Sequence, residues 1–380
     1  MDTVLRWSED GQEHSALWQV DNGARLPSRV QTVSSLDADS AYRLASAGTG
    51  LLWRGDYPAA RQLLQGMSQR MDAAALRKKK VAPTSASEGF AEHRKAQALR
   101  VRVLGQLLIE VSGEYRIALK RAPDVRQACL EAWGAPDGQP RVLSLRNLQG
   151  LIGAHEWRKK GVPIAALGGA HIHPHHGVFS PVRGEYVDLV AQAPLPAALQ
   201  HTPLAFDLGV GTGVLSIMLV RRGVLRVVAT DLSPRALACA QDNLQRLGLQ
   251  AQVELLQTDL YPPGQAALVV CNPPWLPAQP NSALDQAIYD PDSAMLRGFL
   301  AGLAAHLCAG GEGWLILSDL AEHLGLRTRA ALLQWISDAG LQVQGRIDTR
   351  PRHGKAQDAS DPLHAARAAE VTSLWRLGAA

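Results

Sequence analysis

From about residue 202 onward, short apolar segments that predict strands alternate with longer segments that predict helices. The strand segments are TPLAFDLG (202–209), VLRVVATD (224–231), AQVELLQTD (251–259), AALVVC (266–271) and GWLILSD (313–319). Such an alternation predicts a parallel sheet with helices on both faces. Sheets of this kind bind ligands at the carboxyl ends of their strands. The residues that end these strands are therefore the first candidates for function.

The segments between these strands carry helix signals. The clearest is SPRALACAQDNLQRLG (233–248), in which Ser233 fits the N-cap, Pro234 the first turn and Gly248 the C-terminal end. The chain closes with LQVQGRID (341–348) and EVTSLWRL (370–377), which predict an antiparallel pair of strands. This part of the chain is thus expected to form an α/β domain.

Residues 1–165 predict a different, mainly helical domain. The segments 57–71 and 91–111 both place apolar residues at helical spacing, and 122–134 predicts a further helix that ends at Gly134. A chain of 380 residues is long enough for two domains. We therefore expect a boundary near residue 165, followed by a second domain over 166–380.

Charge divides the chain in the same way. Residues 1–170 contain 24 Lys and Arg against 17 Asp and Glu, whereas residues 171–380 contain 15 against 18. A basic front half suits nucleic acid or an acidic partner, although a solvated helical surface explains a modest excess equally well. We expect this half to recognise the substrate.

Composition and cysteine usage indicate a cytoplasmic protein. The chain is 46% hydrophobic and 19% charged, as in globular proteins, and no apolar run approaches the ~18 residues of a membrane span. The acidic N-terminus does not resemble a signal peptide. The four cysteines are scattered without a CxxC pair, which favours reduced thiols.

The first strand of the second domain ends in Asp207, followed by Gly209, Gly211 and Gly213. Closely spaced glycines let a backbone turn sharply and approach a ligand. A dinucleotide fingerprint would need a glycine five residues after Gly209, where this chain has Val214. An acid ahead of the glycines would also repel a pyrophosphate, whereas it suits an ammonium or a sulfonium. A nicotinamide oxidoreductase is thereby disfavoured.

Two further acids end the next two strands. Asp231 follows the first glycine by about twenty residues, where a carboxylate can accept the hydroxyls of a ribose. Asp259 ends the third strand, where a side chain can meet an adenine edge. Each acid alone is a weak signal, because acids commonly cap helices. Three acids that end successive strands beside a glycine turn form a strong joint signal.

The motifs FDLGVGTG, ATDLSP, QTDL and VVCNPPW, in this order, resemble those of a class I S-adenosylmethionine-dependent methyltransferase. The resemblance covers about residues 178–377 and implies a Rossmann-like seven-stranded domain with a cofactor-binding core over 202–377. It implies that the methionine part, the ribose and the adenine of S-adenosylmethionine, or of its product S-adenosylhomocysteine, contact residues at the strand ends. These residues are Asp207, Gly209, Gly211, Thr212, Gly213, Asp231, Leu232, Asp259, Leu260 and Asn272.

Related enzymes carry a segment ahead of the first strand that closes over the cofactor. The corresponding segment of this chain is 171–190, and its candidate residues are Phe179, Arg183 and Tyr186.

The motif Asn272-Pro273-Pro274-Trp275 resembles the Asn-Pro-Pro-aromatic motif of enzymes that methylate planar nitrogens. These enzymes include the release-factor glutamine methyltransferases and the adenine-N6 and guanine-N2 methyltransferases of nucleic acids. The Asn272 side chain and the Pro273 carbonyl can each accept one N–H of the acceptor. The prolines fix the bend of the chain, and Trp275 offers a face for stacking. These four residues are the catalytic candidates.

The acceptor stays open at this point. The aromatic residue is Trp275, where the glutamine enzymes usually have Tyr and the guanine enzymes often Phe. We favour an amide or amine of a protein, peptide or small molecule, with an RNA base as the alternative. A non-catalytic scaffold that binds S-adenosylmethionine is a second alternative, which the intact Asn272 and Pro273 disfavour.

A cluster of histidines, HIHPHHGV, contains His171, His173, His175 and His176. Its spacing resembles no well-known set of zinc ligands, and no carboxylate or Cys lies within it. We expect no metal at this loop. Because it leads into the 171–190 segment, we expect it to line the substrate entrance.

Overall fold

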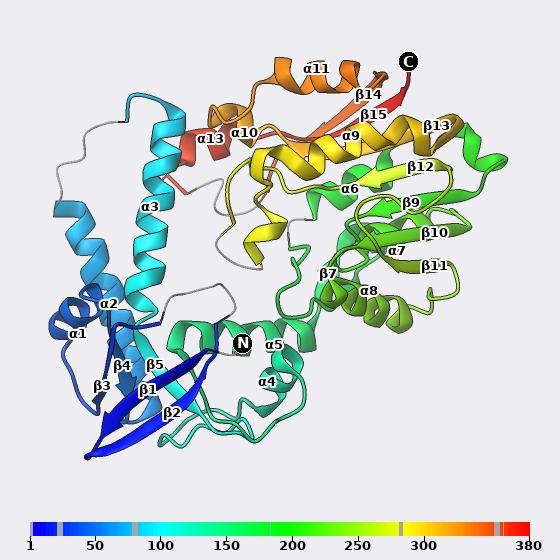
Figure 1. The fold of residues 1–380 in the computed structure, drawn as a ribbon. Coiled ribbons are helices and arrows are strands. Elements are labelled where there is room, and N and C mark those ends of the chain that lie inside the picture. Colours follow the sequence, from blue (N-terminus) through cyan, green and yellow to red (C-terminus); the bar gives the residue numbers. More distant parts are fainter. Residues whose placement is uncertain are drawn as a thin grey trace. The chain divides into compact units, whose positions relative to one another are not determined.

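The computed structural model describes residues 3–20, 26–77, 83–182, 184–280, 284–352, 358–359 and 361–380. The chain forms two compact units (Figure 1). The first comprises Met1–Thr84 and Ala91–Glu156, and the second comprises Ser85–Phe90 and Trp157–Ala380. Arg183, one of the predicted lid residues, lies outside the described residues.

In the second unit, the described residues form a seven-stranded sheet in the order β11-β10-β9-β12-β13-β15-β14. Only β15 runs antiparallel to its neighbours among these strands. The predicted α/β fold, with a largely parallel sheet and an antiparallel closing pair, is therefore confirmed. The strands are β9 (Leu204–Leu208), β10 (Arg226–Asp231), β11 (Val253–Gln257), β12 (Ala266–Cys271), β13 (Leu307–Ser318), β14 (Leu341–Thr349) and β15 (Thr372–Ala379).

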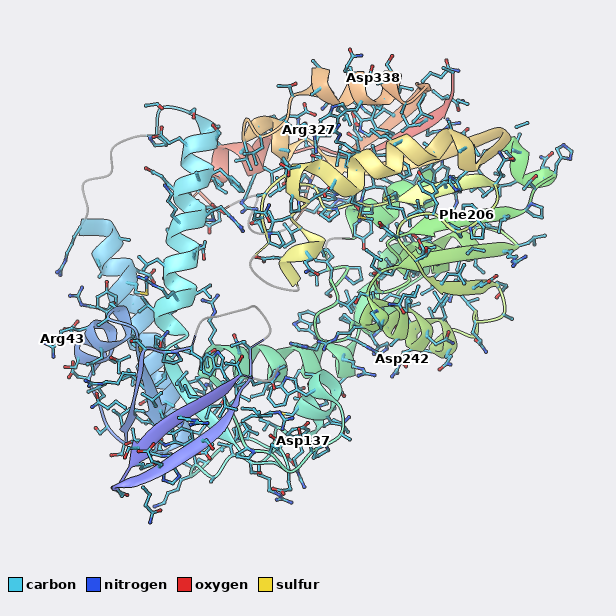
Figure 2. The ribbon with its side chains drawn as sticks, in the orientation of Figure 1. Arg43, Asp137, Phe206, Asp242, Arg327 and Asp338 are labelled. Carbon is cyan, nitrogen blue, oxygen red and sulfur yellow. The ribbon has the colours of Figure 1, made fainter. Side chains whose placement is uncertain are left out.

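Helices cover both faces of this sheet. Successive residues of a strand point to opposite faces, so neighbouring residues pack against different helices. Ala205 of β9 packs in a core cluster with residues of α6, α7 and α8. Its neighbour Phe206, which is labelled in Figure 2, packs with residues of α9 and α11. The five helices are α6 (Glu185–Gln192), α7 (Val214–Arg221), α8 (Pro234–Arg246), α9 (Ala294–His306) and α11 (Arg329–Asp338).

Local sequence signals determine the bounds of α8. The Ser233 side chain accepts a hydrogen bond from the Ala236 backbone N–H at 3.3 Å, and Pro234 occupies the first turn. Beyond the last helical residue, Gly248 adopts a positive φ of 69°. The predicted caps of this helix are therefore confirmed.

Several short elements complete the second unit. They are the antiparallel pair β7 (Val162–Ile164) and β8 (Ala170–Ile172), four 3-10 turns (Ala165–Leu167, Ala197–Gln200, Leu284–Ala287 and Pro291–Ser293), α10 (Leu320–His323) and α13 (His364–Ala369). Val162 and Ile164 belong to the same core cluster as α7. The expected boundary after residue 165 therefore falls inside this unit, because the hairpin is part of its core.

The first unit contains a six-stranded mixed sheet among its described residues, in the order β1-β2-β6-β5-β4-β3. Its strands are β1 (Val4–Glu9), β2 (Gln12–Trp18), β3 (Arg29–Val33), β4 (Thr49–Trp53), β5 (Leu107–Val111) and β6 (Arg141–Ser144). Its helices are α1 (Ala38–Ser46), α2 (Tyr57–Arg77), α3 (Ala86–Leu104), α4 (Arg126–Trp133) and α5 (Leu145–Lys160), the ends of α3 and α5 being counted in the second unit.

The expectation of a mainly helical first domain missed this sheet. The segment 91–111 illustrates the reason, because α3 ends at Leu104 and Leu107–Val111 continues as a strand. Leu107, Leu108 and Ile109 are all fully buried, so the strand shows a continuous apolar run without alternation. Periodicity alone does not separate such a run from a buried helix.

In the described part of the chain, no helix is both long and apolar enough to cross a membrane. All four cysteines are free thiols, and Cys129, Cys239 and Cys271 are buried.

Candidate functional site

The candidate site lies at the carboxyl ends of three adjacent strands. β9 pairs with β10 on one side and with β12 on the other. Leu208, the last residue of β9, is in register with Cys271, the last residue of β12. The glycine loop that follows β9 therefore begins beside Asn272, which follows β12, and beside Asp231, which ends β10.

Backbone hydrogen bonds attach the glycine loop to the end of β10. The N–H groups of Gly209 and Val210 both donate to the Thr230 carbonyl at 2.9 Å. The N–H of Gly211 donates to the Asp231 carboxylate at 3.1 Å. The loop is thus held in one conformation by the neighbouring strand.

This conformation requires glycine. Gly209, Gly211 and Gly213 have φ angles of +80°, +52° and +81°. A Cβ on Gly209 would also lie 2.9 Å from the terminal methyl group of Met295. The loop therefore combines a left-handed backbone with a close approach of α9. Thr212 is 3% exposed, and its carbonyl accepts a hydrogen bond from Asn243 at 3.1 Å, which ties the loop to α8.

The Asp231 carboxylate organises two loops at once. One oxygen accepts the Gly211 N–H, and the other accepts the Ser233 N–H at 2.9 Å. Burial raises the pKa of Asp231. An ionised carboxylate has about four acceptor positions, so both oxygens keep the capacity to accept ligand hydroxyls. The next residue, Leu232, is 63% exposed at the rim.

Asp207 lies deeper than the sequence suggested. Its side chain is only 1% exposed, and its carboxylate accepts a hydrogen bond from the Ser216 hydroxyl of α7 at 2.5 Å. Burial raises the pKa of Asp207 to about 6, and the charge of Asp231 adds to this effect. These contacts favour a role in supporting the glycine loop from below, and direct contact with a cofactor ammonium stays a prediction.

The third predicted acid, Asp259, does not lie directly at the end of its strand. β11 ends at Gln257, two residues before the exposed Asp259. Leu260 has a φ of +55°, and its carbonyl accepts a hydrogen bond from the Thr230 hydroxyl at 2.5 Å. The 259–260 turn is therefore attached to the end of β10, beside Asp231.

The NPPW segment contains a contact that the sequence did not predict. The indole N–H of Trp275 donates to the side-chain oxygen of Asn272 at 3.0 Å. Trp275 is half-buried and packs against both core clusters of the sheet. Of the two prolines between Asn272 and Trp275, Pro273 is buried and Pro274 is half-buried. Trp275 thus fixes the orientation of the Asn272 amide, and the predicted stacking face stays a prediction.

Sequence reasoning missed Asp290, which holds the start of α9 against this segment. Asp290 is 5% exposed, and its carboxylate accepts the backbone N–H groups of Met295 at 3.0 Å and Leu296 at 3.1 Å. Its own N–H donates to the Leu276 carbonyl at 2.8 Å, next to Trp275. The signal was available, because an acid before an apolar helical run is typical of a helix start.

Two of the predicted lid residues, Phe179 and Tyr186, lie in the described part of the chain, and they differ in burial. Phe179 is half-buried, and its contact with the cofactor stays a prediction. Tyr186 is 6% exposed within the core cluster of α6, and burial raises its pKa. Its environment is that of a core residue, and a contact between Tyr186 and the cofactor stays a prediction.

The four histidines attach their loop to the rest of the second unit. His173 bonds through Nδ1 to the Arg158 carbonyl at 2.7 Å, and His171 bonds to the Lys160 carbonyl at 3.1 Å. His175 bonds to Asp242 of α8 at 3.0 Å, and the His176 ring lies 3.1 Å from the Arg235 guanidinium. No group of three or more metal-ligating side chains is assembled among the described residues. The contacts indicate a structural role, and lining of a substrate entrance stays a prediction.

The buried Asp207 generates a prediction on stability. Its folded-state pKa of about 6 exceeds the ordinary 3.8, so the folded protein binds a proton that the unfolded chain has released, and stability falls as pH rises through this window. Asp207→Asn keeps an acceptor for Ser216 but does not titrate. We expect its advantage over wild type to grow by about 2–3 kcal/mol between about pH 4 and pH 7, at ~1.4 kcal/mol per pKa unit. Urea unfolding across pH measures it.

Asp259→Asn, at the exposed turn after β11, is the matched control and should show a much smaller change. A difference between Asp207→Asn and wild type that stays constant with pH would contradict the raised pKa of this carboxyl group.

Comparison with known proteins agrees with this geometry. Residues 169–324 match the methyltransferase small domain family. The release factor glutamine methyltransferase of Cereibacter sphaeroides is 32% identical over 160 residues, which are 38% of this chain and 56% of that protein. The ribosomal RNA small subunit methyltransferase C of Alcanivorax borkumensis is 29% identical over 176 residues, which are 46% of this chain and 47% of that protein.

A third relative, the tRNA1(Val) (adenine(37)-N6)-methyltransferase of Shewanella loihica, is 27% identical over 187 residues, covering 46% of this chain and 72% of that protein. The chain spans about half the length of the first curated relatives that it matches. The matched residues lie in the second unit, whose sheet has the strand order described above. Within this unit, residues 169–324 are therefore similar to the methyltransferase small domain family and lie on a largely parallel seven-stranded sheet.

Proposed function

We propose that this protein is an S-adenosylmethionine-dependent N-methyltransferase that acts on a planar nitrogen. The observation that carries the proposal is the Asn272 amide, which follows β12 beside the glycine loop and whose oxygen is oriented by Trp275. The family match supports the transferase chemistry, and the NPPW segment supports the nitrogen acceptor.

The chemistry of the strand ends suits this cofactor. The pKa values of Asp207 and Asp231 are both raised by burial, so a cation nearby would stabilise their ionised forms. S-adenosylmethionine carries an ammonium and a sulfonium, whereas a nicotinamide dinucleotide would bring a pyrophosphate towards these carboxylates. In the proposal, Asp231 and Leu232 hold the ribose, Asp259 and Leu260 the adenine, and the glycine loop above Asp207 the methionine part. When bound, the cofactor supplies an electrophilic methyl group.

The residues of the chain orient the acceptor. An amide or aryl amine nitrogen is a poor nucleophile because its lone pair is delocalised. The Asn272 oxygen has two lone pairs, of which Trp275 uses one, so the other can accept an N–H of the acceptor. The Pro273 carbonyl can accept the second N–H. Held by both, the nitrogen presents its lone pair out of the plane, and catalysis consists of positioning without a covalent intermediate.

Two classes of acceptor fit this arrangement. An amide of a protein or peptide and an exocyclic amine of an RNA base both offer two N–H groups on a planar nitrogen. The names of the relatives include both a glutamine methyltransferase and RNA methyltransferases. Incubation with labelled cofactor and cell extract, followed by nuclease or protease, separates the two classes.

Cofactor binding is the first test. S-adenosylmethionine and S-adenosylhomocysteine should both raise the melting temperature, because a ligand at about a hundred times its dissociation constant adds ~2.7 kcal/mol of stability. NAD should not. Asp231→Ala should reduce the shift, since it removes the proposed ribose acceptor and a contact of the glycine loop. A shift with NAD and none with the two methionine compounds would refute the cofactor assignment.

Asn272→Ala tests the catalytic proposal. We expect turnover to fall by about 100- to 1000-fold, the usual effect of removing one oriented catalytic hydrogen-bond partner. The cofactor-induced melting shift should stay near wild type, because this proposal assigns the cofactor to the glycine loop, Asp231 and Asp259 and assigns Asn272 to the methyl acceptor. Asn272→Asp retains an acceptor oxygen and should keep more activity than Asn272→Ala. If Asn272→Ala transfers methyl groups at the wild-type rate, the planar-nitrogen assignment fails.

Trp275→Phe tests the orientation of Asn272. It retains most of the packing but removes the indole N–H, so we expect kcat to fall about tenfold, corresponding to a hydrogen bond of ~1.4 kcal/mol. Trp335→Phe, on α11, is the matched control and should leave kcat unchanged.

A double-mutant cycle separates orientation from general damage. In the Asn272→Ala background, Trp275→Phe should have no further effect on kcat, because the group that it orients is gone. Additive losses would mean that Trp275 acts independently of Asn272.

A further inference from the structure

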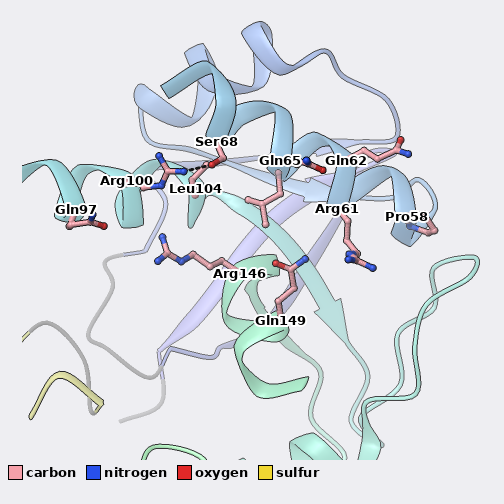
Figure 3. Close-up of a pocket in the computed structure, with 11 residues that line it drawn as sticks. Pro58, Arg61, Gln62, Gln65, Ser68, Gln97, Arg100, Leu104, Arg146 and Gln149 are labelled. Atoms are coloured by element: carbon pink, nitrogen blue, oxygen red, sulfur yellow. Dashed lines mark hydrogen bonds between the residues drawn. The ribbon is translucent and has the colours of Figure 1, made fainter. Parts of the chain in front are cut away.

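The first unit contains a cavity of about 600 Å³ that is open to solvent (Figure 3). It is lined by the side chains of α2, α3 and α5. Its polar lining residues are three arginines, Arg61, Arg100 and Arg146, four glutamines and Ser68, and no acidic residue is among the described residues that line it. Nothing in the methyltransferase domain accounts for this cavity, because all of its lining residues belong to the first unit.

Helix periodicity brings these side chains to one hollow. On α2, Arg61 and Gln65 are four residues apart and therefore share a face. On α3 and α5, Gln97 precedes Arg100 by three residues, and Arg146 precedes Gln149 by the same spacing. Leu64 and Leu104 also line the cavity, and they are 8% and 5% exposed. The three helices thus hold the arginine and glutamine side chains around the cavity, beside two buried leucines.

The charges of the three arginines are only partly compensated. Arg100 donates to Asp72 at 2.5 Å and also to Ser68. Arg61 and Arg146 make no ion pair with any described residue. Desolvation by burial, together with the positive charge of Arg100, lowers the pKa of Arg146. Like charges held together in this way are stabilised when an anion binds between them.

We propose that this cavity binds the phosphate backbone of single-stranded RNA. Guanidinium groups bind phosphate oxygens in a bidentate manner, and three of them suit a chain of phosphates. Glutamine amides both donate and accept, which matches ribose hydroxyls and base edges, whereas an acidic peptide side chain offers acceptors alone. The lining contains no aromatic residue among the described residues, so base stacking is absent there and little sequence preference is expected.

The biological role of the site rests on the proposed function, since it would recruit RNA as the methyl acceptor. Binding itself does not depend on methyl transfer. The site can therefore be tested without cofactor, and failure of one proposal does not imply failure of the other.

The test compares two double variants of the full chain. Arg61→Gln with Arg146→Gln removes the two cavity arginines that have no carboxylate partner among the described residues. Arg43→Gln with Arg116→Gln removes two exposed arginines of the same unit that do not line the cavity (Arg43, Figure 2). Each protein is titrated against a fluorescently labelled single-stranded oligoribonucleotide at several salt concentrations, and anisotropy gives the affinity.

Each phosphate contact to a single strand contributes about 0.7 to the slope of log affinity against log salt, so loss of two contacts should reduce the slope by about 1.4. The control variant should keep the wild-type slope. Both variants should retain the wild-type melting temperature and the melting shift with S-adenosylmethionine, because the changed residues are exposed and lie in the first unit.

Three outcomes would overturn the proposal: no RNA binding by the wild-type protein, equal slopes for the two double variants, or equally strong binding of polyglutamate. The last outcome would indicate an acidic protein partner. A normal RNA result without any melting shift from S-adenosylmethionine would refute the proposed function and leave the RNA site standing.

Discussion

The candidate site depends on the attachment of the glycine loop to the end of β10. Three backbone N–H groups of the loop donate hydrogen bonds to the Thr230 carbonyl and the Asp231 carboxylate. These bonds fix the loop to the end of β10 and to Asp231, the residue proposed to hold the ribose. This arrangement is possible only because Gly209 and Gly211 adopt positive φ and because Gly209 has no Cβ that would meet Met295 of α9. The buried Asp207, bonded to Ser216, supports the loop from below at the expense of a raised pKa.

The features that sequence could predict are those carried by local signals. Ser233, Pro234 and Gly248 mark both ends of α8 by capping and turn chemistry alone, and the structure confirms them. The carboxyl-end location of Asp231 and Asn272 also followed from sequence, because each comes directly at or after a short apolar run. Parallel strands bring such ends together whatever the loops between them do.

The features that sequence could not predict depend on tertiary contacts. The strand Leu107–Val111 reads as a continuation of α3 because its residues are buried on both faces. Tyr186 reads as a lid residue, yet α6 buries it in the core. The cavity arginines lie on three helices that are distant in sequence, so no single window contains the pattern that relates Arg61, Arg100 and Arg146.

The identity of the aromatic residue in the NPPW segment has a physical consequence. An indole N–H only donates, whereas a tyrosine hydroxyl both donates and accepts. Trp275 can therefore pair only with the oxygen of the Asn272 amide, and this pairing excludes the flipped orientation in which the NH2 group takes its place. With its orientation fixed, the side-chain oxygen of Asn272 has one remaining lone pair that can accept a hydrogen bond. A substrate that offers an N–H group can donate this hydrogen bond. A carbonyl or ester oxygen of a substrate cannot, because it would face the Asn272 oxygen without a hydrogen between them. Under the proposed function, the tryptophan thus favours methyl acceptors whose reacting group donates a hydrogen bond, as an amide or aryl amine does.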